Sequence, residues 1–155
     1  MTTFLDYQNR KYDVSVSVEN TSAEKSELLM QLFSENSGGE ICTGAAFVAQ
    51  VWLMTFLKAE GSAAYDDNGC SFVPALLQGH LRTEMDVYQE FALSASQVSR
   101  AITSAENSDD DPEDRFDTAE LENVTIYPGG LALTVKITTQ AGTSRKVILP
   151  LSIIP

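Results

Sequence analysis

The sequence predicts an α+β fold. Two main helices and a short helix are expected to pack with a mostly antiparallel, three-stranded C-terminal meander, and an N-terminal strand joins them. Three β-like runs separated by glycine turns, and two long helical stretches upstream of them, carry this prediction. A chain of 155 residues with 43% hydrophobic content is long enough to bury one core without metals or disulfides.

The predicted meander consists of three runs, Glu120–Tyr127, Leu131–Thr139 and Thr143–Leu151. In the middle run Leu133, Val135 and Ile137 alternate with polar residues, which is typical of a strand with one buried face. Pro128-Gly129-Gly130 and Gln140-Ala141-Gly142 separate the runs and supply the glycines that tight hairpins require.

The N-terminal part offers one clear strand and one ambiguous segment. Residues 12–18 alternate between apolar and polar, and the predicted strand either adds to the edge of the meander or pairs with another chain. Residues 23–35 fit a short helix that begins after Thr21, and they fit an extended segment equally well.

Helices are predicted at 44–60, 72–78 and 83–106. Thr43 is the expected N-cap of the first, Gly61 follows its end, and its apolar residues cover more than one face. We therefore expect this helix to be buried, in its own core or in that of a partner. The third helix has a capping pattern, with Thr83 as N-cap and Asp86 three residues later.

Composition excludes several classes of protein. The net charge of −12 argues against a nucleic-acid surface, and the apolar stretch 45–57 is too short to span a membrane. The N-terminus lacks the pattern of a secretory signal. Cys42, Cys70 and the single histidine, His80, do not form a metal motif, so no metal or cofactor is expected.

No pattern in the chain indicates catalysis. The sequence contains no nucleophile elbow, phosphate-binding loop or Rossmann glycine pattern. His80 has no paired serine motif, so an exposed histidine at a helix start is expected, and we expect no enzyme. A glycosidase needs only two suitably spaced carboxylates, and the 22 acidic residues offer too many pairs to choose among.

Four segments carry a resemblance to a known family: residues 39–44 (GEICTG), residues 50–62 (QVWLMTFLKAEGS), Tyr65 through Gly69 with Phe72 following, and residues 112–126 (PEDRFDTAELENVTI). Together with the final strands, their order resembles the small baseplate wedge proteins, or sheath initiators, of contractile phage tails, which are often labelled lysozyme-like. The family's Glu-Pro-Arg triplet is Glu113-Asp114-Arg115 in this chain. The resemblance divides the chain into an N-terminal strand and extension, 1–38, which has no match, and a wedge-like domain, 39–155.

The resemblance implies a structural role in a virion. Such a protein, made in the bacterial host cytoplasm, would sit in several copies around the tail tube at the baseplate. It would join larger wedge proteins to the first ring of sheath subunits by strand addition. The alternatives are a cell-wall glycan hydrolase, suggested by the family's label, and another tail or neck adaptor.

The resemblance also implies which residues contact partners. A terminal strand around 143–149 would meet the sheath, Pro150 would mark where ladder pairing stops, and the buried helix 44–60 would meet wedge proteins. Arg115 would form an ion pair with Glu113 or with an acid across the contact. The expected interface residues are Arg145, Lys146, Val147, Ile148, Leu149, Trp52, Phe56, Glu113 and Arg115.

Overall fold

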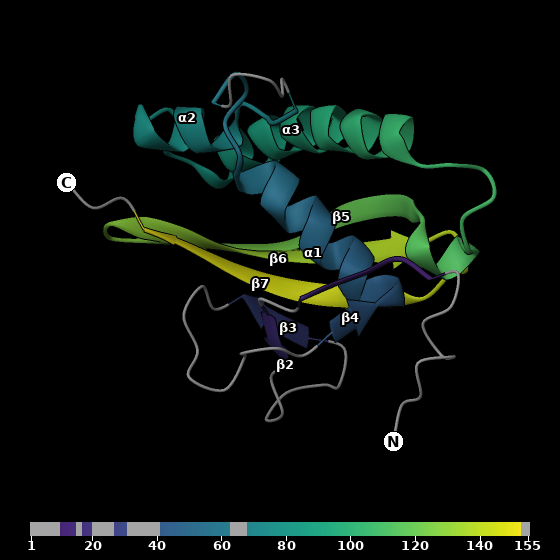
Figure 1. The fold of residues 1–155 in the computed structure, drawn as a ribbon. Coiled ribbons are helices and arrows are strands. Elements are labelled where there is room, and N and C mark those ends of the chain that lie inside the picture. The colour runs from purple at the N-terminus through teal and green to yellow at the C-terminus, as the bar shows by residue number, and fades with distance from the viewer. Residues whose placement is uncertain (1–9, 15–16, 20–26, 31–40, 63–67, 153–155) are drawn as a thin grey trace.

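The computed structural model describes residues 10–14, 17–19, 27–30, 41–62 and 68–152, and it confirms the α+β class (Figure 1). Strands β5 (Phe116–Tyr127), β6 (Gly130–Thr139) and β7 (Ser144–Ser152) form the antiparallel C-terminal meander. Helices α1 (Gly44–Leu57), α2 (Phe72–Leu77) and α3 (Glu84–Ala105) precede it. A short 3-10 helix, η2 (Pro112–Asp114), leads into β5.

The meander has the predicted strand alternation. Val135 of β6 pairs with Leu121 of β5 and Val147 of β7. Leu133, Val135 and Ile137 are buried, whereas the intervening polar residues of β6 are only half-buried. Gly129 and Gly142 have φ of +88° and +84° at the two hairpin turns, which is the backbone conformation that the sequence predicted there.

Four short strands precede the helices. β1 (Tyr12–Val14) pairs with β4 (Ile41–Thr43), and β2 (Ser17–Glu19) pairs with β3 (Glu27–Met30). β3 in turn lies parallel to β7, so the five-stranded sheet has the order β2-β3-β7-β6-β5.

These N-terminal strands refine one prediction and decide between the two alternatives left open in another. The expected strand 12–18 contains two strands: β1 pairs with β4 outside the meander's sheet, whereas β2 lies in that sheet as its outermost strand beyond β3. Residues 27–30 are extended rather than helical, since their backbone pairs with strands on both sides. The rest of the ambiguous segment 23–35 lies outside the described residues.

The helices match the predictions closely in position. α3 has the predicted capping box, in which the Thr83 hydroxyl accepts a hydrogen bond from the Asp86 N–H and the Asp86 carboxylate accepts one from the Thr83 N–H. Thr43 is the N-cap residue of α1 as predicted, but its side chain makes no capping hydrogen bond. His80 is exposed in the connection between α2 and α3, as expected.

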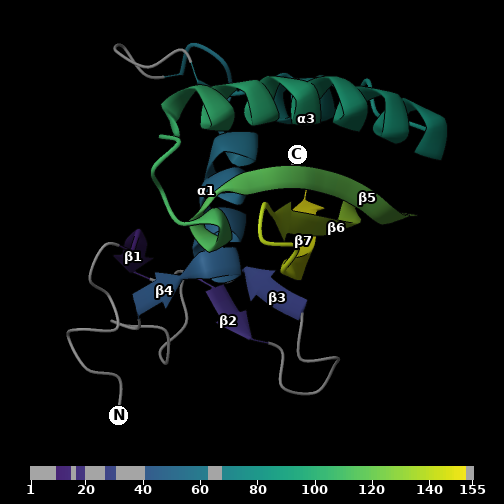
Figure 2. The ribbon, with the colours of Figure 1, turned by 90° about the vertical axis from the view of Figure 1, so that its right-hand side faces the viewer.

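The core lies between the helices and one face of the sheet. Seen along the strands, α1 crosses that face and α3 lies along β5, beyond the upper edge of the sheet (Figure 2). The Trp52 and Phe56 rings stack with centroids 4.8 Å apart, and Phe72 and Phe91 pack around them. These rings join the helices into a single unit on the buried side of β6.

Candidate functional site

The two sides of the meander are covered in different ways. On the β5 side, α3 lies along the strand in both views (Figures 1 and 2). On the β7 side, β3 pairs with only three consecutive residues, from Lys146 to Ile148. Since β7 has nine residues, most of its outer backbone is not paired with β3. The β7 side is therefore the candidate site for strand addition.

Of the predicted interface residues on β7, some side chains face the core. Val147 and Leu149 are buried at 0% and 3% exposure and belong to the hydrophobic cluster. This corrects the expectation that their side chains contact a partner, because alternation along the strand turns them toward the helices.

Arg145, Lys146 and Ile148 are the half-buried members of the predicted set on β7. Lys146 lies on the solvent face of the sheet, where its Nζ is 3.2 Å from Glu122 Oε2 of β5. Arg145 pairs in register with Ile137 and so lies on the opposite face. The two basic residues therefore do not form one basic patch.

Trp52 and Phe56, the predicted contacts of helix 44–60, are core residues. Both side chains have 0% exposure and stack on each other inside this chain. This corrects the expectation that they contact a wedge partner: neither side chain reaches the surface in this structure. Of the two locations considered for this helix, the structure shows the protein's own core.

Glu113 and Arg115 do not form the expected ion pair with each other. Glu113 Oε2 is instead 3.3 Å from Arg10 Nη2, on the first described segment. The Arg115 Nε is buried without a hydrogen-bond partner among the described residues. Its charge still acts on Asp110, where it is one of the smaller contributions that lower the pKa.

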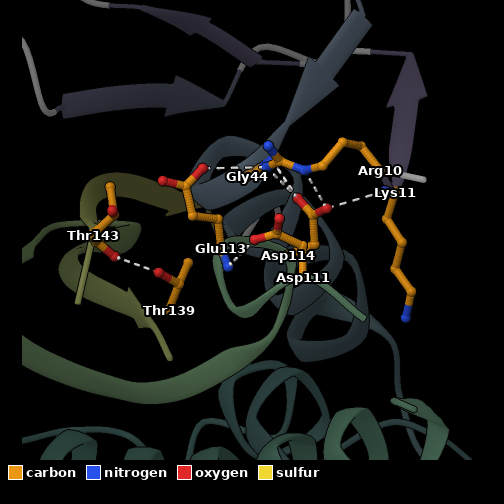
Figure 3. A network of polar contacts seen from close by, with 8 residues as sticks. All are labelled: Arg10, Lys11, Gly44, Asp111, Glu113, Asp114, Thr139 and Thr143. Carbon is orange, nitrogen blue, oxygen red and sulfur yellow. Dashed lines mark hydrogen bonds and ion pairs between the residues drawn. The ribbon is translucent and has the colours of Figure 1, made fainter. Parts of the chain in front are cut away.

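The third member of the triplet, Asp114, is the centre of a polar network (Figure 3). The Asp114 residue is 2% exposed, and Arg10 approaches its carboxylate with two nitrogens, Nε at 2.7 Å from Oδ2 and Nη2 at 2.9 Å from Oδ1. The Lys11 N–H donates to Oδ2 at 3.1 Å and the Gly44 N–H to Oδ1 at 2.8 Å. Four hydrogen bonds thus join β1's leading residues, α1 and η2.

The electrostatics of this network favour the charged forms. Burial of Asp114 by itself would raise its pKa, but hydrogen bonds from Arg10, Gly44 and Lys11 outweigh that effect, and the pKa lies below its ordinary value. The hydrogen bond to Asp114 raises the pKa of Arg10. Next to it, Lys11 Nζ lies 2.6 Å from Asp110 Oδ2, and this contact lowers the pKa of Asp110.

The network also explains how α1 begins. Gly44 has a φ of +61°, which favours glycine, and its N–H points at Asp114 rather than at a local cap. The first turn of α1 contains no acidic residue. The carboxylate of Asp114 therefore supplies from η2 the negative charge that stabilises a helix N-terminus.

Sequence reasoning missed this network. It singled out Asp114 only as a departure from the family's proline, and it placed Arg10 in the unmatched segment. One signal was present: Arg10-Lys11 and Arg145-Lys146 are the basic pairs of an otherwise acidic chain. The sequence did not indicate which of the many acids those pairs would meet.

A second polar cluster joins α2 to α3. The Ser71 hydroxyl donates to Glu90 Oε1 at 2.5 Å, the Ser71 N–H donates to Gln97 Oε1, and Ser94 is buried beside them. These bonds fix the start of α2 on α3. Glu90 and Gln97 are therefore turned toward α2 and are half-buried.

The described residues contain neither a candidate metal site nor a candidate membrane-spanning helix. In the described part of the chain, no three His, Cys, Asp or Glu side chains gather in a way that could hold a metal ion. No described helix is both long and apolar enough to cross a membrane.

Comparisons with family models, with curated proteins and with solved structures returned no match for this chain.

Proposed function

We propose that this protein is a structural component of a contractile tail baseplate that links wedge proteins to the first ring of sheath subunits. The sequence resemblance suggests the role. The observation that carries it is the β7 strand, whose outer side pairs with the described strands at only three positions. Unpaired strand backbone is the feature that strand addition uses.

The fold supports a contact through backbone rather than through side chains. On β7, the hydrophobic side chains of Val147 and Leu149 are used by the core, and Lys146 is paired within the chain. What β7 offers a partner is its peptide N–H and C=O groups. A sheath strand that pairs with them would satisfy these groups without any change in the core.

Pro150 limits how far such pairing extends. It pairs with Ala132 in the β6–β7 ladder, which continues to Ser152. Proline is tolerated inside a strand where its nitrogen faces away from the neighbouring ladder. Its nitrogen therefore faces the β3 side, and β3 pairing stops at Ile148, two residues earlier. The β6–β7 ladder continues past Pro150, so the stop that we expect concerns only a strand added on the β3 side.

The experiment measures binding of the purified protein to the sheath subunit encoded in the same genome. Deleting the terminal strand is a poor test, because β7 contributes buried residues and the fold would be lost. Ile148→Pro is sharper, since alternation places its N–H on the same side as the nitrogen of Pro150. We expect binding to fall while the circular dichroism spectrum stays close to wild type. The melting temperature should fall modestly, because the proline also removes one hydrogen bond to β3.

Unchanged binding of a folded Ile148→Pro variant would move the interface away from β7. A proline at Asn123 would be a poor control, because it would disturb the ladder between β5 and β6. The control variant is Thr125→Ala, at an exposed position of β5, and it should bind the sheath subunit normally. A zymogram on peptidoglycan tests the hydrolase alternative. Clear lysis at enzyme-like turnover would overturn the structural proposal.

A further inference from the structure

We infer that β3 blocks the outer side of β7 and that a partner strand binds there by displacing β3. This inference rests on the proposed strand addition and says how the same edge is regulated. Residues Glu27, Leu28 and Leu29 of β3 pair with Lys146, Val147 and Ile148. A partner strand cannot pair with those positions while β3 occupies them.

The pairing of β3 differs from that of the meander in extent and direction. β6 and β7 pair antiparallel along nine registered positions, whereas β3 and β7 pair parallel along three. A parallel ladder is slightly less stable per residue than an antiparallel one. β3 is thus the least extensively attached neighbour of β7.

β2, the strand beyond β3, stabilises the position of β3 only slightly. β2 is the outermost strand of this sheet, and it pairs with β3 at three positions. In Figure 1 the β2–β3 pair lies below β7, on the side of the sheet away from α3. β5 is the outermost strand at the other side of this sheet, and α3 lies along it in Figure 2 without pairing with it.

Pro150 keeps the exchange local. Since its nitrogen carries no hydrogen, β3 or any strand in its place loses the next donor after Ile148. The replacing strand therefore pairs with the segment that β3 covers and does not extend continuously to Ser152. The occupant that fits is a short extended segment, such as a free strand end of a sheath subunit.

The test uses a fluorescein-labelled synthetic peptide of residues 25–32 and the full-length chain. A double variant, Glu27→Cys with Lys146→Cys, places two thiols at paired positions of β3 and β7. Reduced and oxidised forms of this one variant form a matched pair, and mass spectrometry after digestion verifies the new bond. The native Cys42 and Cys70 are buried.

We expect fluorescence anisotropy to show that the reduced form binds the peptide. The oxidised form should bind it at least about tenfold more weakly. Leu28→Pro removes the N–H that β3 donates to β7, because the Ile148 N–H faces β3 and its parallel neighbour Leu28 then makes the bonds across the ladder. This variant should bind the peptide more tightly than wild type. A dimer that exchanges β3 between two copies also supports the inference, because β3 must leave its own edge.

Equal binding by the oxidised and reduced forms would overturn the inference, and so would failure of both the reduced form and Leu28→Pro to bind. Sheath binding, measured separately, distinguishes the two proposals. If the peptide exchanges with β3 but the sheath subunit does not bind, the proposed function fails and the inference about β3 remains. If the sheath subunit binds the oxidised form as well as the reduced form, the inference about β3 fails and the proposed function remains.

Discussion

Arg10 donates two hydrogen bonds to the Asp114 carboxylate, 104 positions later in the chain, with Nε and Oδ2 2.7 Å apart. The Asp114 side chain is 1% exposed and that of Arg10 is 24% exposed. The pair therefore connects a segment outside the family resemblance to the turn where the resemblance departs from its own pattern. A proline at 114 would lack the side chain that makes this contact.

Removing the carboxylate should destabilise the fold strongly. Asp114→Ala leaves the Arg10 charge and the buried Gly44 N–H without their partner, and breaking a buried ion pair costs about 3 kcal/mol or more. Urea unfolding at neutral pH measures the change. Asp109→Ala, at an exposed position of the same acidic segment, is the matched control and should change stability by less than about 0.5 kcal/mol. Similar losses in both variants would contradict a central role for Asp114.

The same carboxylate predicts a pH dependence. Its folded pKa is lowered, so its contribution is complete above the ordinary aspartate pKa of about 3.9 and is lost as the pH falls through the folded pKa. The free energies of unfolding of wild type and Asp114→Asn should differ most near neutrality and converge toward pH 2. A difference that stays constant from pH 7 to pH 2 would show that the charge of Asp114 does not matter.

The glycine at the start of α1 should resist substitution because of its backbone. Gly44→Ala places a side chain at a φ of +61°, which costs about 1 to 2 kcal/mol. The added Cβ lies 3.5 Å from Arg10 Nη2, an ordinary contact, so no clash adds to the strain. Gly142→Ala, with a φ of +84° and open space around it, should lose a similar amount in thermal unfolding. A much larger loss at Gly44 would mean that the Arg10 contact also moves.

The aromatic residues of α1 should affect folding before they affect assembly. Trp52→Ala removes a fully buried ring that stacks on Phe56, and such truncations cost about 3 to 5 kcal/mol. Met54→Ala, on the same helix and 52% exposed, should leave the melting temperature nearly unchanged. If Trp52→Ala kept full stability and lost only partner binding, the core assignment would be wrong.

Replacing Arg115 should affect assembly rather than folding, in contrast to Trp52. Its side-chain Nε has no hydrogen-bond partner among the described residues, so Arg115→Ala should change the unfolding free energy by less than about 1 kcal/mol. The proposed assembly role predicts a clear loss of tail assembly in a complementation assay. Normal assembly by the variant would remove Arg115 from the proposed interface, whereas Arg145→Ala provides a second basic residue for comparison.

Local signals in the sequence determined much of this protein. The alternation in β6, the glycines of the two hairpin turns and the capping box of α3 depend on near neighbours, and each of these predictions is confirmed. The same local rule predicted that Trp52 lies in a buried helix. Periodicity and turn chemistry are properties of short segments, so the sequence alone is enough to find them.

Tertiary structure decided what contacts what across long separations. Gly44 is capped by Asp114 rather than by its neighbour Thr43, and β7 pairs with β3 although more than a hundred residues lie between them. Both contacts depend on where the chain returns in space, which no local pattern encodes. An acidic chain offers Arg10 many carboxylates of equal appearance, and only the packing of α1 against η2 selects the buried one.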